Sequence, residues 1–181
     1  MIEYMGRYSY DPRSITCYTY GDPDHKMYIG HFTSIASNIK VFLADGKGHE
    51  PTNGTTYPFG CTRQDIFTNF INIPYKSKGN VVIGNDCWIG DSVTFMSGVT
   101  VGDGAVVATN SHVFKDVPPY SIVGGNPARI IKYRFEQEII DKFLELQWWN
   151  LPDSEINKII PELQKPPTLE TFDRISEILK G

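Results

Sequence analysis

The chain has 181 residues, of which 40% are hydrophobic and 21% are charged, and its formal net charge at pH 7 is −4. This length suits one compact domain of the usual ~100 to 200 residues, and the composition excludes a disordered or collagen-like chain. Acidic residues slightly outnumber basic ones and no basic stripe is present, so no nucleic acid partner is expected. We therefore expect a single domain over 1–181.

The N-terminal segment, 1–28, contains no long apolar run. It lacks the ~7 to 15 apolar residues of a signal peptide, and nowhere does the chain approach the ~20 apolar residues that span a bilayer. Cys17, Cys61 and Cys87 are an odd number, and their spacings match neither a zinc ribbon nor a redox CxxC pair. The sequence therefore predicts a cytoplasmic protein with no membrane partner.

Large apolar residues recur every six positions along the middle of the chain: Ile83, Ile89, Phe95, Val101, Val107 and Val113. Between them stand pairs of turn-forming residues, such as Asn85-Asp86 and Asp103-Gly104, which tolerate left-handed backbone angles. A period of six matches neither an α-helix nor a hairpin meander. It predicts a triangular prism of short strands, in which each coil takes three hexads and residues 18 apart stack.

The same pattern begins earlier, at Ile29, Ile35 and Val41, so we expect coils over 29–130. It lapses over about 44–80, where Gly, Pro, Thr and Asn are frequent and aromatic residues are interspersed. We interpret this stretch as an excursion loop. Long ordered loops on a rigid scaffold tend to carry function.

The C-terminal segment, 131–181, changes to a helical period. One helix is predicted from Phe135 to Trp149, a second from Asp153 as N-cap until Pro161 stops it, and a third from Thr168. The last coil of a prism presents unpaired strand edges. We therefore expect these helices to cap the open end of the prism.

Several ordered motifs resemble the xenobiotic acetyltransferases, the hexapeptide-repeat family whose members acetylate streptogramin A antibiotics and chloramphenicol. The motifs are 29–36, His49, 55–59, 83–90, 115–120, 124–128 and Trp148-Trp149-Asn150. The resemblance implies a mainly β fold: a left-handed parallel β-helix of hexapeptide repeats with an excursion loop and C-terminal capping α-helices. It also implies a homotrimer that binds acetyl-CoA in a cleft between neighbouring subunits. The hexads by themselves predict only the prism.

The reaction needs a base that takes a proton from a hydroxyl, and histidine titrates in the right range. The resemblance places His49 at the position of the family's catalytic histidine, six residues before the Thr55–Phe59 motif. Acceptor selectivity is expected from the loop and the N-terminal aromatic residues. Tyr57, Phe59 and Tyr8 are the predicted walls of an apolar acceptor slot.

The resemblance also implies a set of residues for the acetyl-CoA co-substrate. Trp88 corresponds to the tryptophan that borders the acyl-CoA channel. Gly90 and Ala108 would offer backbone N–H groups to pantetheine and to the developing oxyanion. Lys115 and Arg129 match positions where family members place cations for the coenzyme A phosphates.

A metal-dependent reaction is an alternative, since γ-type carbonic anhydrases share the β-helix and bind metal through three histidines. His25, His31 and His49 do not show the expected spacing, so no metal is predicted. A covalent acetyl-enzyme is also disfavoured, because Cys87 falls on a core position and Cys61 has no base in register. We expect direct attack of the acceptor on acetyl-CoA.

Three residues depart from the family pattern: Phe114 replaces a small aliphatic residue, and Ser97 and Asn38 replace prolines. These changes leave the acetyl donor unaffected but keep the acceptor open. The predicted function is acetyl transfer to a hydroxyl of a streptogramin- or chloramphenicol-type small molecule. The alternatives are O- or N-acetylation of a nucleotide-linked sugar in surface polysaccharide synthesis, and a non-catalytic β-helix scaffold.

Overall fold

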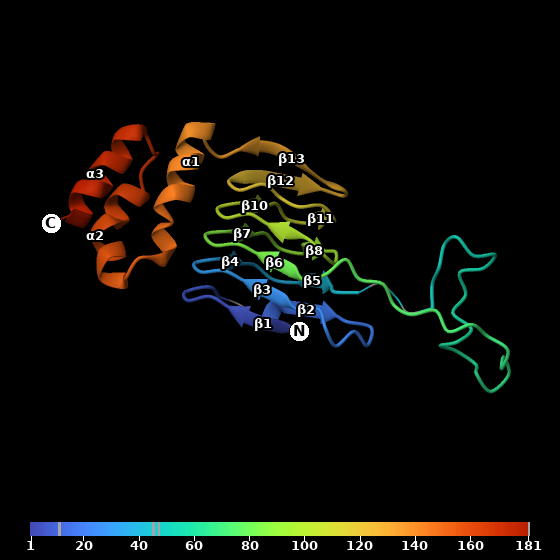
Figure 1. Cartoon of the computed structure of the whole chain (residues 1–181). Coiled ribbons are helices and arrows are strands. Elements are labelled where there is room, and N and C mark those ends of the chain that lie inside the picture. The colour runs from blue at the N-terminus through green and yellow to red at the C-terminus, as the bar shows by residue number, and fades with distance from the viewer. Residues whose placement is uncertain (11, 45, 47, 181) are drawn as a thin grey trace.

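The computed structural model of the chain describes residues 1–10, 12–44, 46 and 48–180. Asp45 and Lys47 of the predicted loop and Gly181 of the predicted helical segment lie outside the described residues. Short strands are stacked into a column, three helices lie beside it, and one long loop leaves it on the other side (Figure 1).

The strands form three sheets, which are the three faces of the predicted prism. The first face contains β1 (Ile2–Met5), β3 (Met27–Ile29), β6 (Val81–Ile83) and β9 (Thr100–Val101). The second contains β4 (Ser34–Ile35), β7 (Trp88–Ile89), β10 (Val106–Val107), β12 (Ser121–Gly125) and β13 (Ala128–Tyr133). The third contains β2 (Ile15–Tyr18), β5 (Ile39–Phe42), β8 (Thr94–Phe95) and β11 (His112–Val113). All neighbours are parallel except the pair β12–β13.

The predicted stacking of residues 18 apart is confirmed. The pairs are Ile83 with Val101, Ile89 with Val107, and Phe95 with Val113. The earlier hexads stack in the same columns, but there the partners lie 54 positions apart: Ile29 with Ile83, Ile35 with Ile89, and Val41 with Phe95. The excursion loop is therefore an insertion between two adjacent coils that leaves their register unchanged.

The corners between faces use the left-handed backbone that the turn pairs predict. The second residue of a pair has positive φ at Asp86 (52°), Ser92 (57°) and Asn110 (59°). At Gly104 (68°) a glycine is required for a further reason, since an added Cβ would lie 2.4 Å from the ring of Tyr120. The corners thus close because Asp, Asn, Ser and Gly tolerate this conformation.

The interior of the prism is filled by the hexad residues, and Ile29, Val41, Phe95, Val101 and Val107 are fully buried. Cys87 belongs to this core, as predicted. Burial raises the pKa of its thiol to about 12. A thiol in such surroundings is not a nucleophile near neutral pH.

The coils begin earlier than predicted. Strand β1 pairs with β3, and β2 pairs with β5, so the first coil starts at Ile2 inside the segment 1–28. The register shifts between Ile2 and Tyr4, and a single-turn 3-10 helix (Pro12–Ser14) precedes β2. This irregularity hides the period of six in the sequence.

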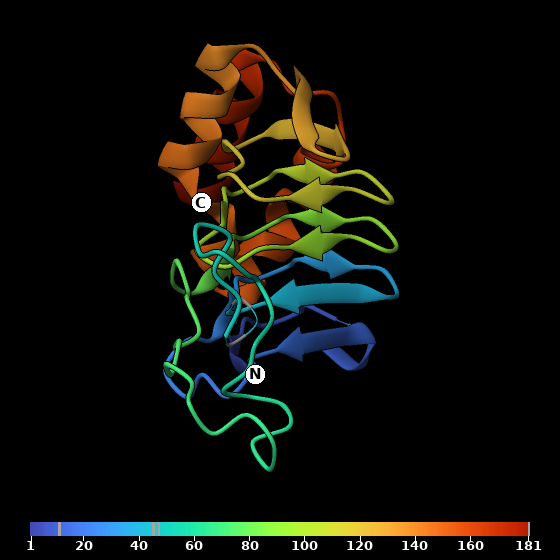
Figure 2. The same cartoon turned by 90° about the vertical axis from the view of Figure 1, so that its right-hand side faces the viewer.

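The helices are α1 (Gln137–Leu146), α2 (Asp153–Leu163) and α3 (Leu169–Lys180), with a 3-10 turn at Trp148–Asn150. They lie beside the column of coils rather than over its end (Figures 1 and 2). Tyr120 stacks on Phe143 at 5.5 Å between ring centroids, and Phe32 packs on Trp148 at 4.7 Å. The predicted capping position is therefore wrong. The antiparallel strand β13 covers the edge of β12 instead.

Two helix boundaries also differ from the prediction. Pro152, not Asp153, is the N-cap of α2, and the Asp153 carboxylate binds the guanidinium of Arg7 at 2.8 Å. Helix α2 continues through Pro161, because a proline in the last turn removes only one backbone bond. The buried Glu162 holds this turn through ion pairs with Lys165 at 2.6 Å and Arg174 at 2.8 Å. Among the described residues, no helix has the length and apolar character to cross a membrane.

Candidate active site

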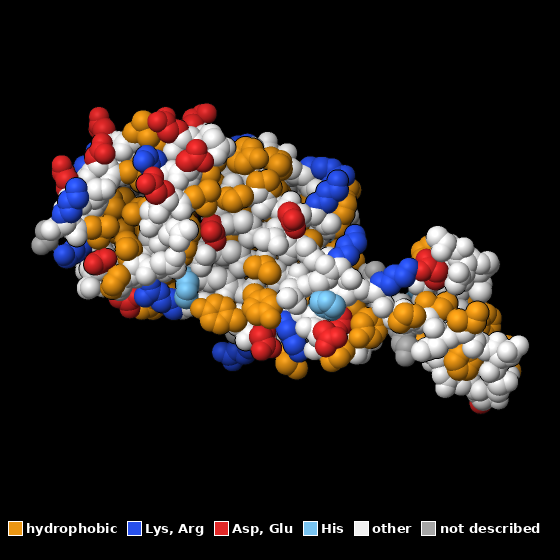
Figure 3. Space-filling model, in the orientation of Figure 1, with side chains coloured by type: hydrophobic (Ala, Val, Ile, Leu, Met, Phe, Trp, Pro, Cys, Tyr) orange, Lys and Arg blue, Asp and Glu red, His pale blue; other side chains and the backbone are white. Residues whose placement is uncertain are grey.

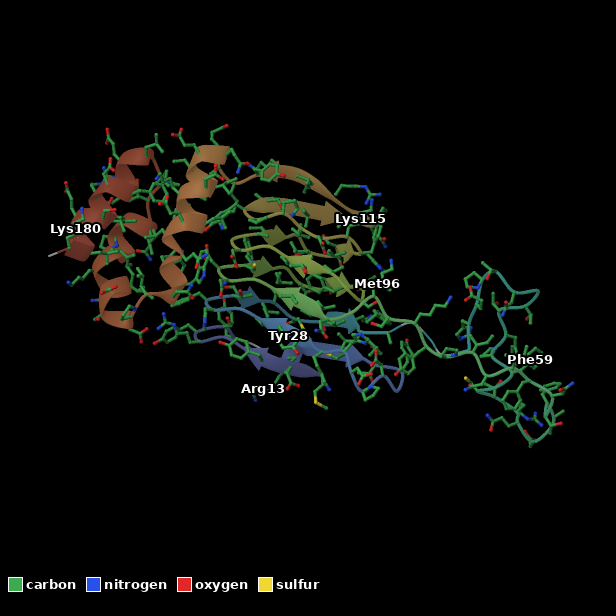
Figure 4. All side chains as sticks on the ribbon, viewed as in Figure 1. Arg13, Tyr28, Phe59, Met96, Lys115 and Lys180 are labelled. Carbon is green, nitrogen blue, oxygen red and sulfur yellow. The ribbon has the colours of Figure 1, made fainter. Side chains whose placement is uncertain are left out.

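The excursion loop extends away from its own coils (Figures 1 and 2). It carries a small aromatic cluster of its own, in which the Phe59 ring centroid lies 4.7 Å from that of Tyr57 and 5.1 Å from that of Phe67. An ion pair between Lys76 and Glu50 joins its two limbs. Figure 4 shows Phe59 at the distal part of the loop, far from the labelled residues of the coils. The loop is therefore a folded projection.

His49 lies exposed in this loop, with its Nδ1 2.9 Å from the carbonyl oxygen of Thr56. Because a carbonyl oxygen only accepts, this hydrogen bond assigns the proton of the neutral imidazole to Nδ1 and leaves Nε2 as an acceptor. Gly48 has φ 88°, and an added Cβ would lie 2.7 Å from Pro58, so the turn before His49 requires glycine. The loop thus fixes the His49 ring so that Nε2 is the nitrogen able to accept a proton.

A hollow of about 570 Å³ is lined by loop residues alone. Gly48, Thr55 and Tyr57 line it and adjoin His49 and its hydrogen-bond partner Thr56 in sequence, but the side chain of His49 is not part of the described lining. Tyr57 and Phe59, two predicted acceptor walls, lie in it together with Ile66, Phe67 and Phe70. No charged side chain is among the described residues that line it. Ile66, Phe67 and Phe70 were not predicted as wall residues. Their apolar character within a polar loop could have indicated them.

Tyr8, the third predicted acceptor wall, lies elsewhere. Its ring packs 5.0 Å from that of Phe32, and its hydroxyl donates to the carboxylate of Asp153 at the start of α2. This hydrogen bond raises the pKa of Tyr8, since ionisation would place a phenolate beside the Asp153 carboxylate. Within one chain the helices and the loop lie on opposite sides of the coils (Figure 1). The structure therefore does not bring Tyr8 to Tyr57 and Phe59.

Trp88 lies on the second face, and its side chain is 61% exposed. It stands between Ser34 of β4 and Val106 of β10. Within the described part of the chain, it is not among the residues that line the hollow of the loop. A large ring exposed on the coils is thus available to a ligand or to another copy of the chain.

Gly90 and Ala108 require a correction. The N–H of Gly90 donates to the carbonyl oxygen of Val107 at 2.8 Å, and that of Ala108 to the carbonyl of Val123 at 2.9 Å. Both donors belong to the ladder between coils, so they are not free for pantetheine or an oxyanion. Gly90 serves close packing instead, since an added Cβ would lie 2.6 Å from the backbone nitrogen of Thr109.

The structure brings Lys115 and Arg129 together at the last coil, around a hollow of about 410 Å³. Phe114 directly precedes Lys115 in sequence, and the Arg129 guanidinium carbon is 5.6 Å from the centroid of its ring. Figure 4 shows Lys115 at the edge of the prism from which the loop departs, and Figure 3 shows basic side chains at this end. This positive hollow can hold phosphate groups.

Two of the other histidines, His25 and His31, have structural partners. His25 Nδ1 lies 2.5 Å from the buried carboxylate of Asp22, and His31 Nδ1 accepts from the backbone N–H of Arg7 at 2.9 Å. Burial, with the nearby Arg7 charge, lowers the pKa of His31. Within the described ranges, no three His, Cys, Asp or Glu side chains are placed to share a metal ion.

The corner that faces α1 contains a titratable group that the sequence did not indicate. Burial raises the pKa of Asp86 to about 6, although Arg134, 3.6 Å away, opposes the shift. The buried hydroxyl of Tyr120 beside it has no hydrogen-bond partner among the described residues, and burial also raises the pKa of that phenol. This corner lies by the helices and not by the loop, so we assign it to stability.

The comparisons agree with this geometry. The family described as bacterial transferase hexapeptide (six repeats) matches residues 80–115. A probable macrolide acetyltransferase of Lysinibacillus sphaericus is 48% identical over 134 residues, which cover 72% of this chain and 73% of that protein. A chloramphenicol acetyltransferase of Klebsiella aerogenes is 38% identical over 169 residues, covering 88% and 80%.

Among solved structures, a hexapeptide-repeat acetyltransferase from Vibrio cholerae superposes with a TM-score of 0.52 at 27% identity, covering 73% of this chain and 62% of that one. The stacked parallel coils therefore define a hexapeptide-repeat acyltransferase. The chain belongs to the xenobiotic acetyltransferase family, and its co-substrate is acetyl-CoA.

Proposed function

We propose that the enzyme acetylates a hydroxyl of a small, largely apolar antibiotic of the chloramphenicol, streptogramin or macrolide type. The observation that carries this proposal is the hollow of the loop, where aromatic and aliphatic residues predominate and no charged side chain is among the described lining residues. A nucleotide-linked sugar brings phosphates, which need cations or several donors. The hollow therefore favours an apolar acceptor over the sugar alternative.

We place the complete active site between copies of the chain, in a homotrimer of left-handed β-helices. His49 projects on a loop that extends away from its own coils, whereas Trp88 is exposed on those coils. The loop also exposes Ile71 to 85% and Ile66 to 55%, which is costly unless another surface covers them. His49 of one copy then reaches acetyl-CoA bound along the coils of the next.

Acetyl-CoA supplies the acetyl thioester, and coenzyme A leaves as the thiol. His49 Nε2 takes the proton from the acceptor hydroxyl as its oxygen bonds to the carbonyl carbon, and returns a proton to the departing sulfur as the C–S bond breaks. Thr56 holds the imidazole in the required tautomer through Nδ1. Positioning both reactants and transferring the proton are the chain's contributions. Cys87 is buried, so no acetyl-enzyme forms on it.

The co-substrate contacts follow from the same placement. Lys115 and Arg129 hold the phosphates, and Trp88 borders the acyl channel. Gly90, which has no side chain, and Ala108, which has only a methyl group, leave room along that channel rather than offering free N–H groups to it. Tyr57 and Phe59 form the acceptor walls, and any part for Tyr8 requires another copy of the chain. Cys17 and Cys87 are free thiols, which fits an enzyme of the reducing cytoplasm.

The test is coenzyme A thiol release from acetyl-CoA with chloramphenicol, a macrolide, a streptogramin A and nucleotide-linked sugars as acceptors. We expect release with one of the antibiotics, and a loss of kcat of about 10² to 10⁴ in His49→Ala. The matched control is His112→Ala, a half-buried histidine on β11, which should retain activity.

Two outcomes contradict the proposal. Release with nucleotide-linked sugars alone would establish the polysaccharide alternative. Absence of both release and acetyl-CoA binding would instead indicate a scaffold.

A further inference from the structure

The hollow at the last coil combines an exposed aromatic ring with two cations. Phe114 points outward from the third face and is 36% exposed, directly after the buried Val113 of β11. Arg129 comes from β13 and lies over the Phe114 ring at 5.6 Å, and Lys115 completes the rim. Two strands that are not paired with each other thus meet at one site.

The electrostatics of this hollow favour a negatively charged ligand. Among the described residues, neither Lys115 nor Arg129 makes an ion pair, and the recorded bond of Arg129 is to the adjacent carbonyl of Ala128 at 2.8 Å. Asp116 is the one acidic residue of the described lining, and its carboxylate accepts from the backbone N–H of Thr100 at 2.8 Å. The Asp116 carboxylate therefore forms a hydrogen bond to the neighbouring coil.

The walls are apolar between these charges. Val123 and Ala128 lie beside Phe114, and the volume of about 410 Å³ falls in the ~300 to 1,000 Å³ range of small-ligand sites. A guanidinium packed on a phenyl ring presents two flat surfaces, and such surfaces bind planar heteroaromatic bases by stacking. The hollow therefore suits a ligand with a planar base and phosphate groups together.

We propose that Phe114 and Arg129 form a stacking platform for the adenine ring of acetyl-CoA, with Lys115 beside the phosphate on its ribose. This inference rests on the proposed function, which places the same cations at coenzyme A. It adds a base-recognising residue at the position where this chain replaces a small aliphatic side chain. Pantetheine is flexible and has no aromatic ring, so it gains no comparable contact with Phe114.

The binding test uses adenosine 3′,5′-bisphosphate, the nucleotide half of coenzyme A, titrated calorimetrically into the whole chain. Phe114→Val should raise its Kd about tenfold, since loss of one base–aromatic stack typically has an effect of this size. Phe114→Tyr should retain the affinity of the unmodified chain. Tyr10→Val removes a more exposed ring outside the hollow (57% against 36% for Phe114) and is the control.

A kinetic test distinguishes the loss of base stacking from a general loss of enzyme structure in Phe114→Val. Phe114→Val should raise the KM for acetyl-CoA about tenfold with kcat unchanged, and should leave the KM for acetyl-pantetheine unchanged. Equal Kd values for adenosine 3′,5′-bisphosphate in Phe114→Val and the unmodified chain would overturn the platform, even with normal acetyl transfer. Phe114-dependent binding without acetyl transfer to any acceptor would support the platform while contradicting the proposed function.

Discussion

Single residues at the corners of the prism combine two tasks, closing the chain and contacting its neighbours. Asp86 shows this most clearly, because it adopts a φ of 52° and also lies beside Arg134 and the buried Tyr120 hydroxyl. Its turn-forming property was evident in the sequence. Its raised pKa was not, because the cause is burial at a corner where Tyr120 and Arg134, from segments much later in the chain, lie beside it.

Asp86→Asn should make stability less dependent on pH. The folded-state pKa of about 6 lies above the ordinary value of 3.8, so the folded chain binds this proton more tightly. The corresponding stabilisation is complete below the ordinary pKa and is lost as pH rises through about 6. Asparagine tolerates positive φ and carries no charge. The variant should therefore gain up to about 2 kcal/mol relative to the unmodified chain between pH 4 and pH 8.

Urea unfolding at both pH values measures this difference, with the exposed Asp173→Asn as control. The same relative stability at pH 4 and pH 8 would contradict the assignment.

At the scale of elements, Arg7 makes several of the polar contacts that hold the helices against the coils. The Arg7 guanidinium donates to the carbonyl oxygens of Trp149 (2.9 Å) and Leu151, and pairs with Asp153 at 2.8 Å. It also lies 5.5 Å from the Phe32 ring centroid. The first coil and the segment before α2 are thereby joined across most of the chain length. No spacing rule in the sequence links residues so far apart.

Arg7→Ala should lower the free energy of unfolding by about 2 kcal/mol, because two carbonyl groups lose a charged donor. Chemical denaturation followed by tryptophan fluorescence measures the effect, since Trp148 and Trp149 lie at this junction. The exposed Arg13→Ala should change stability by less than about 0.5 kcal/mol. Equal effects of the two substitutions would show that Arg7 does not fasten the helices.

At the scale of the whole molecule, the candidate residues are divided between the loop and the coils. His49, Tyr57 and Phe59 belong to the projection, whereas Trp88, Lys115 and Arg129 belong to the prism. The loop insertion preserves the stacking of the coils on either side of it, so it can extend outward without disturbing the core. This division is what favours a site completed by a second copy.

Mixed trimers should test this arrangement. His49→Ala lacks the base and Trp88→Ala lacks a channel wall, so each alone should be inactive or nearly so. If loop and channel come from different copies, random co-assembly restores about a quarter of the sites, because some interfaces pair an intact loop with an intact channel. Thiol release by the co-expressed pair, compared with a mixture of separately assembled variants, measures it. No recovery after co-assembly would place the site within one copy.

The sequence by itself determined the hexad coils, their corners, the buried Cys87, the excursion loop and the family. These are encoded locally, since a period of six and turn-forming pairs report the backbone geometry of each coil. Even so, the irregular first coil was missed. Strands β1 and β2 are positioned by hydrogen bonding to β3 and β5, and their residues do not follow the period of six.

Only the tertiary structure decided that the helices lie along the coils, that Tyr8 binds Asp153, and that the Gly90 and Ala108 donors are engaged. It also brought Arg129 onto Phe114 and gathered Phe67 and Phe70 into the hollow of the loop. Each of these depends on contacts between segments that no sequence spacing relates, and it is packing and hydrogen-bond satisfaction in the complete structure that select them.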